Sequence, residues 1–130
     1  MIFGFFEKNL SKEARQLRKD VASIVGMVES TYRPELLDKI ARMTRDGIIK
    51  VQNLCGDDAT YRAREVDRYK VLHRDARRQN AQGELTAYTL IIINTRALAY
   101  GELGAPVCAL IDEFLQRWPG EVEAEDVMAV

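Results

Sequence analysis

Histidine and cysteine are scarce in this chain of 130 residues, which contains one histidine, His73, and two cysteines, Cys55 and Cys108. A structural zinc site needs four Cys or His ligands, and a di-iron helical bundle needs Glu-x-x-His pairs on two helices. The chain supplies neither set, so we expect no metal and no cofactor. Because the two cysteines are far apart and lie among apolar neighbours, we expect reduced, partly buried thiols in a cytoplasmic protein.

The sequence also has no glycine-rich phosphate-binding loop of the GxGxxG or P-loop type. Its apolar runs are far shorter than the roughly 20 residues of a membrane span. Its start lacks the basic region and the long apolar core of a signal peptide. The net charge is −1, whereas proteins that coat nucleic acid usually carry a clear basic excess. We therefore expect neither secretion nor a membrane span, and any anion binding must be local.

Prolines and glycines are few, with three and eight in the whole chain, and the content of hydrophobic (47%) and charged (30%) residues is that of an ordinary globular protein. A chain of this length buries a core without disulfides or metals. We predict a single α-helical domain over residues 1–120. Residues 121–130 contain four acids and no base, which predicts a mobile acidic tail.

Apolar residues recur at steps of three and four, the spacing of amphipathic helices. A first helix is expected over residues 12–31, with Ser11 as its N-cap. Pro34 suits the start of a second helix, which should end at Gly56, and Gly47 should let a neighbouring helix approach closely. The core-facing residues of these two helices are Leu17, Val21, Ile24, Val28, Leu37, Ile40, Thr44, Ile48, Val51 and Leu54.

Asp57 or Asp58 should cap a third helix that extends to about Gln82, where Gly83 ends or bends it. Its apolar stripe consists of Tyr61, Tyr69, Leu72 and Ala76. Residues 85–100 are almost uncharged and rich in β-branched side chains, so helix and strand compete there. The length of the segment, its helical flanks and the lack of a second strand favour a central, buried helix.

The last helix should begin at Pro106 and end at Pro119-Gly120. It has the clearest amphipathic pattern, with Val107, Leu110, Ile111, Phe114, Leu115 and Trp118 on one face. The sequence therefore predicts an all-α bundle of four to five helices.

The segment 62–78 is rich in arginine, with seven basic residues against three acidic ones and a local formal charge of +4. As a phosphate or nucleic-acid site it would use arginines as forked donors and tyrosines for stacking. The candidate site residues are Arg64, Arg68, His73, Arg74, Arg77, Arg78 and the tyrosines Tyr61 and Tyr69. The simpler interpretation is a solvated or intersubunit face, held by pairs three residues apart: Arg62–Glu65, Arg64–Asp67 and Asp75–Arg78.

Glu65 falls inside the apolar stripe of the third helix when residues are placed at 100° each. An ionised carboxylate there needs a cationic partner. We predict a pair with Arg62, Arg68 or Arg96. Arg96 is favoured because it would otherwise lie unpaired on the buried helix.

His73 on a helical bundle resembles the phosphoryl-accepting residue of histidine phosphotransfer domains, in which a nearby cation stabilises the phosphoryl group. Those domains usually carry lysine three residues later and then glycine, whereas Ala76 and Arg77 stand here. An ordinary histidine at the edge of the core is the simpler interpretation.

The N-terminal residues Ile2, Phe3, Phe5 and Phe6 fold back over the bundle as a staple or form an exposed anchor for a partner. The surplus of apolar seams favours a non-enzymatic protein-binding or regulatory module, homodimeric, that binds itself or another protein. The alternatives are an anion-binding regulator that uses the Arg-rich helix for nucleic acid or a phosphorylated ligand, and phosphotransfer through His73.

Overall fold

The computed structural model describes the backbone of residues 2–119 and the side chains of residues 11–119. Within these ranges the chain forms helices and no strand. In chain order they are α1 (Ile2–Thr31), α2 (Pro34–Cys55), α3 (Ala59–Arg78), α4 (Gln82–Leu98), the 3₁₀ helix η1 (Gly101–Gly104) and α5 (Ala105–Arg117). The predicted all-α fold is confirmed. The acidic segment 121–130 lies outside the described residues.

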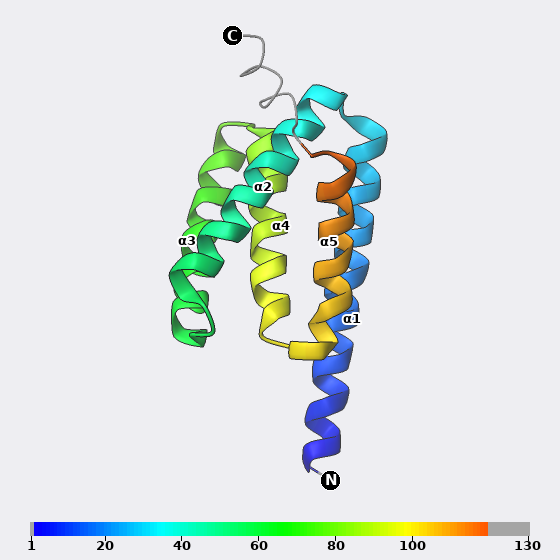
Figure 1. Ribbon diagram of the computed structural model, residues 1–130, viewed down its shortest axis with the longest axis vertical. Coiled ribbons are helices and arrows are strands. Elements are labelled where there is room, and N and C mark those ends of the chain that lie inside the picture. Colours follow the sequence, from blue (N-terminus) through cyan, green and yellow to red (C-terminus); the bar gives the residue numbers. More distant parts are fainter. Residues whose placement is uncertain (1, 120–130) are drawn as a thin grey trace.

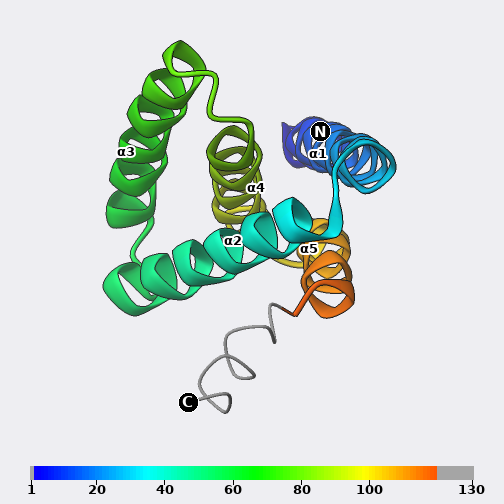
Figure 2. The same cartoon turned by 90° about the horizontal axis from the view of Figure 1, so that it is seen from above.

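Helix α4 is the centre of the fold, as the sequence predicts. It packs against α1, α2, α3 and α5, and Figure 2 shows these helices arranged around it. The hydroxyls of Thr89 and Thr95 donate to the carbonyls of Leu85 and Ile91, four residues earlier, at 2.8 Å each. These bonds satisfy the hydroxyls within the helix, so β-branched residues do not force a strand here.

Helix α1 is longer than predicted, because it begins at Ile2 and runs through Ser11. The prediction of an N-cap at Ser11 is therefore wrong; no proline interrupts residues 2–10, so the helix continues through them. In Figure 1 the first turns of α1 extend beyond the end of the bundle, so this backbone does not fold back as a staple. The side chains of residues 2–10, which include the apolar N-terminal group, lie outside the description.

Helix α2 has the predicted bounds. Arg33 is extended (φ −72°, ψ 155°), Pro34 opens the helix, and Gly56 closes it with φ 51°. A Cβ on Gly47 would collide with the side chain of Ile91 in α4, so the predicted close approach is confirmed. Leu54 was predicted to face the core but is 62% exposed. The buried residue that follows Val51 on this face of α2 is Cys55, four positions later.

Helix α3 starts as predicted, since the Asp58 carboxylate accepts from the backbone N–H groups of Thr60 and Tyr61 at 2.9 and 3.2 Å. Its end was predicted wrongly. It stops at Arg78 because Asn80 adopts a left-handed conformation with φ 54°. Gly83 therefore belongs to the first turn of α4, where a Cβ would lie 3.1 Å from Leu36 Cδ1.

The core has two parts. The larger lies between α1, α2, α4 and α5 and contains the fully buried Phe114 and the confirmed α1 seam of Leu17, Val21 and Val28. The smaller lies between α2, α3 and α4, where Tyr69 packs near Ile91. Among the described residues, α3 packs mainly on α4 and to a lesser extent on α2, so a large part of its surface is left open. Tyr61 is 52% exposed, so its assignment to the inward stripe is wrong.

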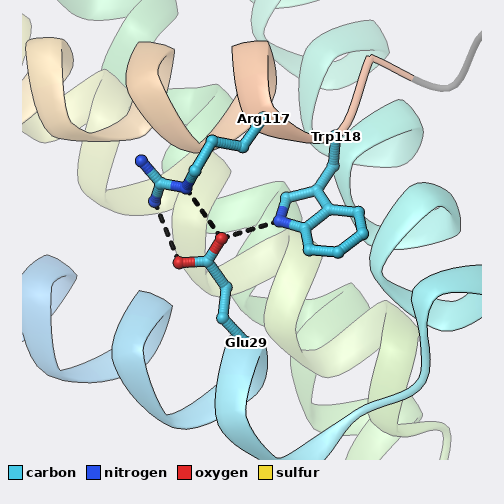
Figure 3. Close-up of polar contacts among 3 residues, drawn as sticks. All are labelled: Glu29, Arg117 and Trp118. Carbon is cyan, nitrogen blue, oxygen red and sulfur yellow. Dashed lines mark hydrogen bonds and ion pairs between the residues drawn. The ribbon is translucent and has the colours of Figure 1, made fainter.

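A polar cluster joins the ends of α1 and α5 (Figure 3). Arg117 Nε and Nη2 donate to the Glu29 carboxylate at 2.8 and 2.9 Å, and Trp118 Nε1 donates to it at 2.7 Å. The hydrogen bond from Arg117 holds the pKa of Glu29 below its ordinary value of 4.5. The cluster fixes the register of the two helices at this end of the bundle.

Among the described residues, no helix has the length and apolar content needed to cross a membrane.

Candidate binding groove

The arginines of α3 point in several directions and do not converge on one hollow. Arg68 Nε lies 2.6 Å from Glu65 Oε2, and the Arg68 guanidinium lies 4.6 Å from the centre of the Tyr69 ring. Arg64 lies over Tyr61 at 5.6 Å. These contacts are local, so both arginines are held close to their own helix.

Arg62 has a structural partner in the turn before α3, because its guanidinium donates to the carbonyls of Gly56 and Asp57 at 3.5 and 3.1 Å. It thereby satisfies two carbonyl groups of the turn that connects α2 to α3. Among the described residues, none of the three side-chain pairs proposed for a solvated face occurs. The predicted salt bridges therefore do not stabilise α3.

Arg74, Arg77 and Arg78 are exposed on the last turns of α3. Within the described part of the chain, no residue accepts a hydrogen bond or ion pair from these three side chains. Their donors are therefore open to solvent or to an anion.

Glu65 pairs with an arginine, as predicted, and its side chain is only 12% exposed. The partner is Arg68 and not the favoured Arg96. Glu65 faces the end of α2, where burial raises the pKa of the Cys55 thiol and the charge of Glu65 raises it further. Arg96 lies in the groove described next, on a different side of α3, so the two cannot meet.

The groove runs between α3 and α4 as two adjoining hollows of about 310 and 350 Å³, which share Arg96. It lies on the face turned away from α2, since the α3 residues that face α2, such as Tyr69, do not line it. Figure 2 shows α2 crossing the other side of the α3 and α4 pair. The lining residues are Ala59, Arg62, Ala63, Val66, Asp67, Lys70 and His73 of α3, and Thr89, Ile92, Ile93, Thr95, Arg96, Ala99 and Tyr100 of α4 and its C-cap.

Each wall of the groove presents a regular seam. On α3 the seam is Ala59, Ala63, Val66, Lys70 and His73, and on α4 it is Thr89, Ile92, Arg96 and Ala99. Both advance by alternating steps of three and four, the spacing of residues that pack against another helix. Sequence reasoning missed the α3 seam because the more apolar stripe around Tyr69 dominates the helix. The alternating spacing of Ala59, Ala63 and Val66 is the signal that could have found it.

The groove carries a surplus of positive charge. Arg62, Lys70 and Arg96 line it together with a single carboxylate, that of Asp67. Lys70 and Arg96 are exposed, so both can rotate toward a bound anion. Between these charges the surface is formed by aliphatic side chains and methyl groups, such as those of Val66 and Ile92.

His73 is half-buried at one end of this groove. Burial lowers the pKa of His73, and the charge of Arg77 lowers it further, so the imidazole is neutral at neutral pH. The hollow that it lines contains the cation of Lys70 but no carboxylate to orient the ring. The Thr89 hydroxyl beside it already donates to Leu85.

Comparison with protein-family models, curated proteins and solved structures found no match for this chain.

Tyr69 does not reach the groove. Its ring is 5% exposed, packs against Tyr88 with 5.8 Å between the ring centres, and is covered by Arg68. Base stacking needs an exposed aromatic face. Of the two tyrosines considered for stacking, Tyr61 is the exposed one, and it already lies against Arg64.

Both cysteines are free thiols, with Cys55 buried and Cys108 half-buried. Burial raises the pKa of each thiol, so both are protonated and weakly nucleophilic at neutral pH. Among the described residues, no group of three or more potential metal ligands comes together.

Another hollow, of about 540 Å³, lies between α2 and α5 and includes Ile48, Ile49 and Leu115. Its arginine, Arg45, donates to the carbonyls of Leu115 and Trp118 at 3.0 and 3.4 Å. Arg45 thus caps α5, and the α3–α4 groove is the better candidate for a charged partner.

Proposed function

We propose that this protein is a non-enzymatic, cytoplasmic protein-binding or regulatory module that acts as a homodimer. The observation that carries the proposal is the extension of α1 beyond the bundle (Figure 1). This extension contains three of the four phenylalanines in the chain. A short helix without tertiary contacts is marginally stable in water, and aromatic side chains dominate protein interfaces. Two such extensions that pair about a two-fold axis would stabilise each other.

The spacing of apolar residues supports this proposal. Ala14, Leu17 and Val21 are buried against the bundle. In the sequence, the same three- and four-residue spacing continues backward through Leu10, Phe6 and Phe3. A second chain that packs on the extension would therefore continue the helix packing that already exists inside the bundle.

Light scattering over a concentration range tests the homodimer. We expect twice the chain mass of 14.8 kDa at high micromolar concentration. The double substitution Phe3→Ser and Phe6→Ser should give a monomer, because it removes the two phenylalanines of the extension that continue the apolar spacing of Ala14, Leu17 and Val21. The matched control Leu54→Ser changes a side chain that is 62% exposed on α2 and should remain a dimer. A strict monomer in the unsubstituted protein would exclude the homodimer.

A second candidate function is regulation through anion binding, and the open donors of Arg74, Arg77 and Arg78 favour it. If each arginine neutralises a phosphate, affinity for a short single-stranded oligonucleotide should fall steeply with salt. Replacing all three with alanine should flatten that dependence, whereas Arg64→Ala should change it less because Arg64 lies against Tyr61. Absence of binding at low salt would remove this candidate.

Phosphotransfer remains the third candidate, since Lys70 lines the same hollow as His73 and could stabilise a phosphoryl group. Incubation with a radiolabelled small phosphodonor tests it. Label that persists in a His73→Gln variant would rule out His73 as the acceptor.

A further inference from the structure

We infer that the α3–α4 groove is the docking site for an acidic, amphipathic helix of a partner protein. The inference rests on the proposed protein-binding function but not on the homodimer, which uses a different surface. It names the surface, the secondary structure of the partner and the sign of its charge.

The two seams indicate a helical partner. A helix that lies between α3 and α4 would place its own apolar residues among Ala63, Val66 and Ile92, which recur at the spacing of helix-to-helix packing. Helices that are apolar nearly all round are usually buried on all sides. On α4, however, Thr89, Ile92 and Ala99 are half-buried or exposed along the groove. A docked helix would complete the burial of α4.

The charges indicate an acidic partner. Arg96 stands where the two hollows meet, Lys70 lines the hollow that contains His73, and Arg62 lines the other one. Carboxylates that flank the apolar stripe of a docked helix would meet these cations on both sides. A basic helix would meet the surplus of positive charge and be repelled.

The groove fits nucleic acid less well. Single strands bind by stacking bases on exposed aromatic rings along a basic channel. The aromatic rings that line this groove are His73, which is half-buried, and Tyr100, whose hydroxyl donates to Glu13 at 2.6 Å. Between the charged groups the lining consists mainly of aliphatic side chains and methyl groups, which suit leucine or valine side chains better than bases.

Methyl NMR with selectively labelled isoleucine locates binding, because Ile92 and Ile93 line the groove while Ile49 lies in the α2–α5 hollow. The probe is a helix-stabilised synthetic peptide with leucine at the a and d heptad positions and glutamate on both flanks. The control is a basic peptide with the same leucines and with lysine in place of glutamate. We expect the acidic peptide to shift the Ile92 and Ile93 signals and to bind at least about tenfold more tightly than the basic peptide.

Charge-reversal variants test the role of the cations. Arg96→Glu and Lys70→Glu should each weaken binding of the acidic peptide by about tenfold at low salt. Lys12→Glu is the matched control, an exposed lysine on α1 outside the groove, and should leave affinity unchanged. Circular dichroism of each variant confirms folding. Equal affinity for both peptides, or shifts confined to Ile49, would overturn the inference.

The remaining outcomes identify other occupants and would also overturn the inference. If the Ile92 and Ile93 signals shift with protein concentration when no peptide is present, a second copy of this chain occupies the groove. Groove signals of the peptide-free protein that shift when the chain is shortened to end at Pro119 indicate occupation by the segment 120–130. An oligonucleotide that displaces the peptide from the unsubstituted protein, but not from the Arg96→Glu variant, indicates that the groove binds nucleic acid. Light scattering of the same samples reports the homodimer separately, so the two proposals fail independently.

Discussion

Gly104 leaves no room for a side chain, because a Cβ there would overlap the carbonyl group of Ala97 in α4. This contact closes the turn through η1 that brings α5 against the core. A rigid backbone carbonyl cannot move aside as a flexible side chain can. Glycine is therefore required at this position because it has no side chain.

We predict that Gly104→Ala lowers the free energy of unfolding by about 3 kcal/mol, since the added methyl group separates α5 from α4. Gly26→Ala is the matched control on α1, where a Cβ would meet nothing within 4 Å. It should raise stability by about 0.5–1 kcal/mol, because alanine favours helix over glycine. Urea unfolding monitored by circular dichroism measures both. Similar effects of the two substitutions would contradict the packing at Gly104.

At the scale of single elements, α3 differs from α2, α4 and α5 in having an N-cap whose side chain makes hydrogen bonds. Within the described part of the chain it packs mainly on α4 and α2, and the smaller core cluster holds it in place. The Asp58 cap satisfies two backbone donors at its start. The cap therefore adds to the stability of this helix, which forms one wall of the groove.

Asp58→Ala should reduce the free energy of unfolding by about 1 kcal/mol, the usual loss when an N-cap is removed. The rate of amide hydrogen exchange should increase first in the opening turn of α3. Asp57→Ala is the control, because the next residue, not Asp57, makes the cap bonds. If both substitutions had the same effect, general charge and not capping would explain the result.

At the scale of the whole molecule, long-range polar contacts tie α1 to the rest of the bundle. Glu29 joins it to the end of α5 and Glu13 joins it to Tyr100, beside the groove. Lys39 of α2 meets Glu84 of α4 at 2.6 Å. Most of these groups are partly exposed, so each pair contributes modestly.

The lowered pKa of Glu29 predicts the direction of the pH dependence. Its folded-state pKa lies below the ordinary 4.5, so its stabilising contribution is complete above that pH and is lost as pH falls through the lowered value. We expect Glu29→Gln to cost about 1–2 kcal/mol at neutral pH and much less near pH ~3. Thermal unfolding across this range measures it, with Glu102→Gln, an exposed residue, as control. If the difference in stability between the unsubstituted protein and the Glu29→Gln variant stayed constant across this pH range, the proposed pH dependence would be wrong.

The sequence by itself determined the helices and much of their internal detail. The bounds of α2, the cap at Asp58, the burial of α4 and the close approach at Gly47 all follow from spacing or from single residues. They could be predicted because helix formation, capping and periodicity depend on residues within a few positions of one another. The need of Glu65 for an arginine followed in the same way, from its place in the apolar stripe.

Only the tertiary structure decided which neighbour each face meets. Spacing could not choose between Arg68 and Arg96 as the partner of Glu65, because that choice depends on how α3 rotates against α4. The end of α3 at Arg78, followed by the left-handed turn at Asn80, likewise depends on how closely α4 must fold back. The groove exists because α2 covers one side of the α3 and α4 pair and leaves the other side open. Periodicity gives each helix its faces, but the packing of whole helices selects which face stays open to a partner.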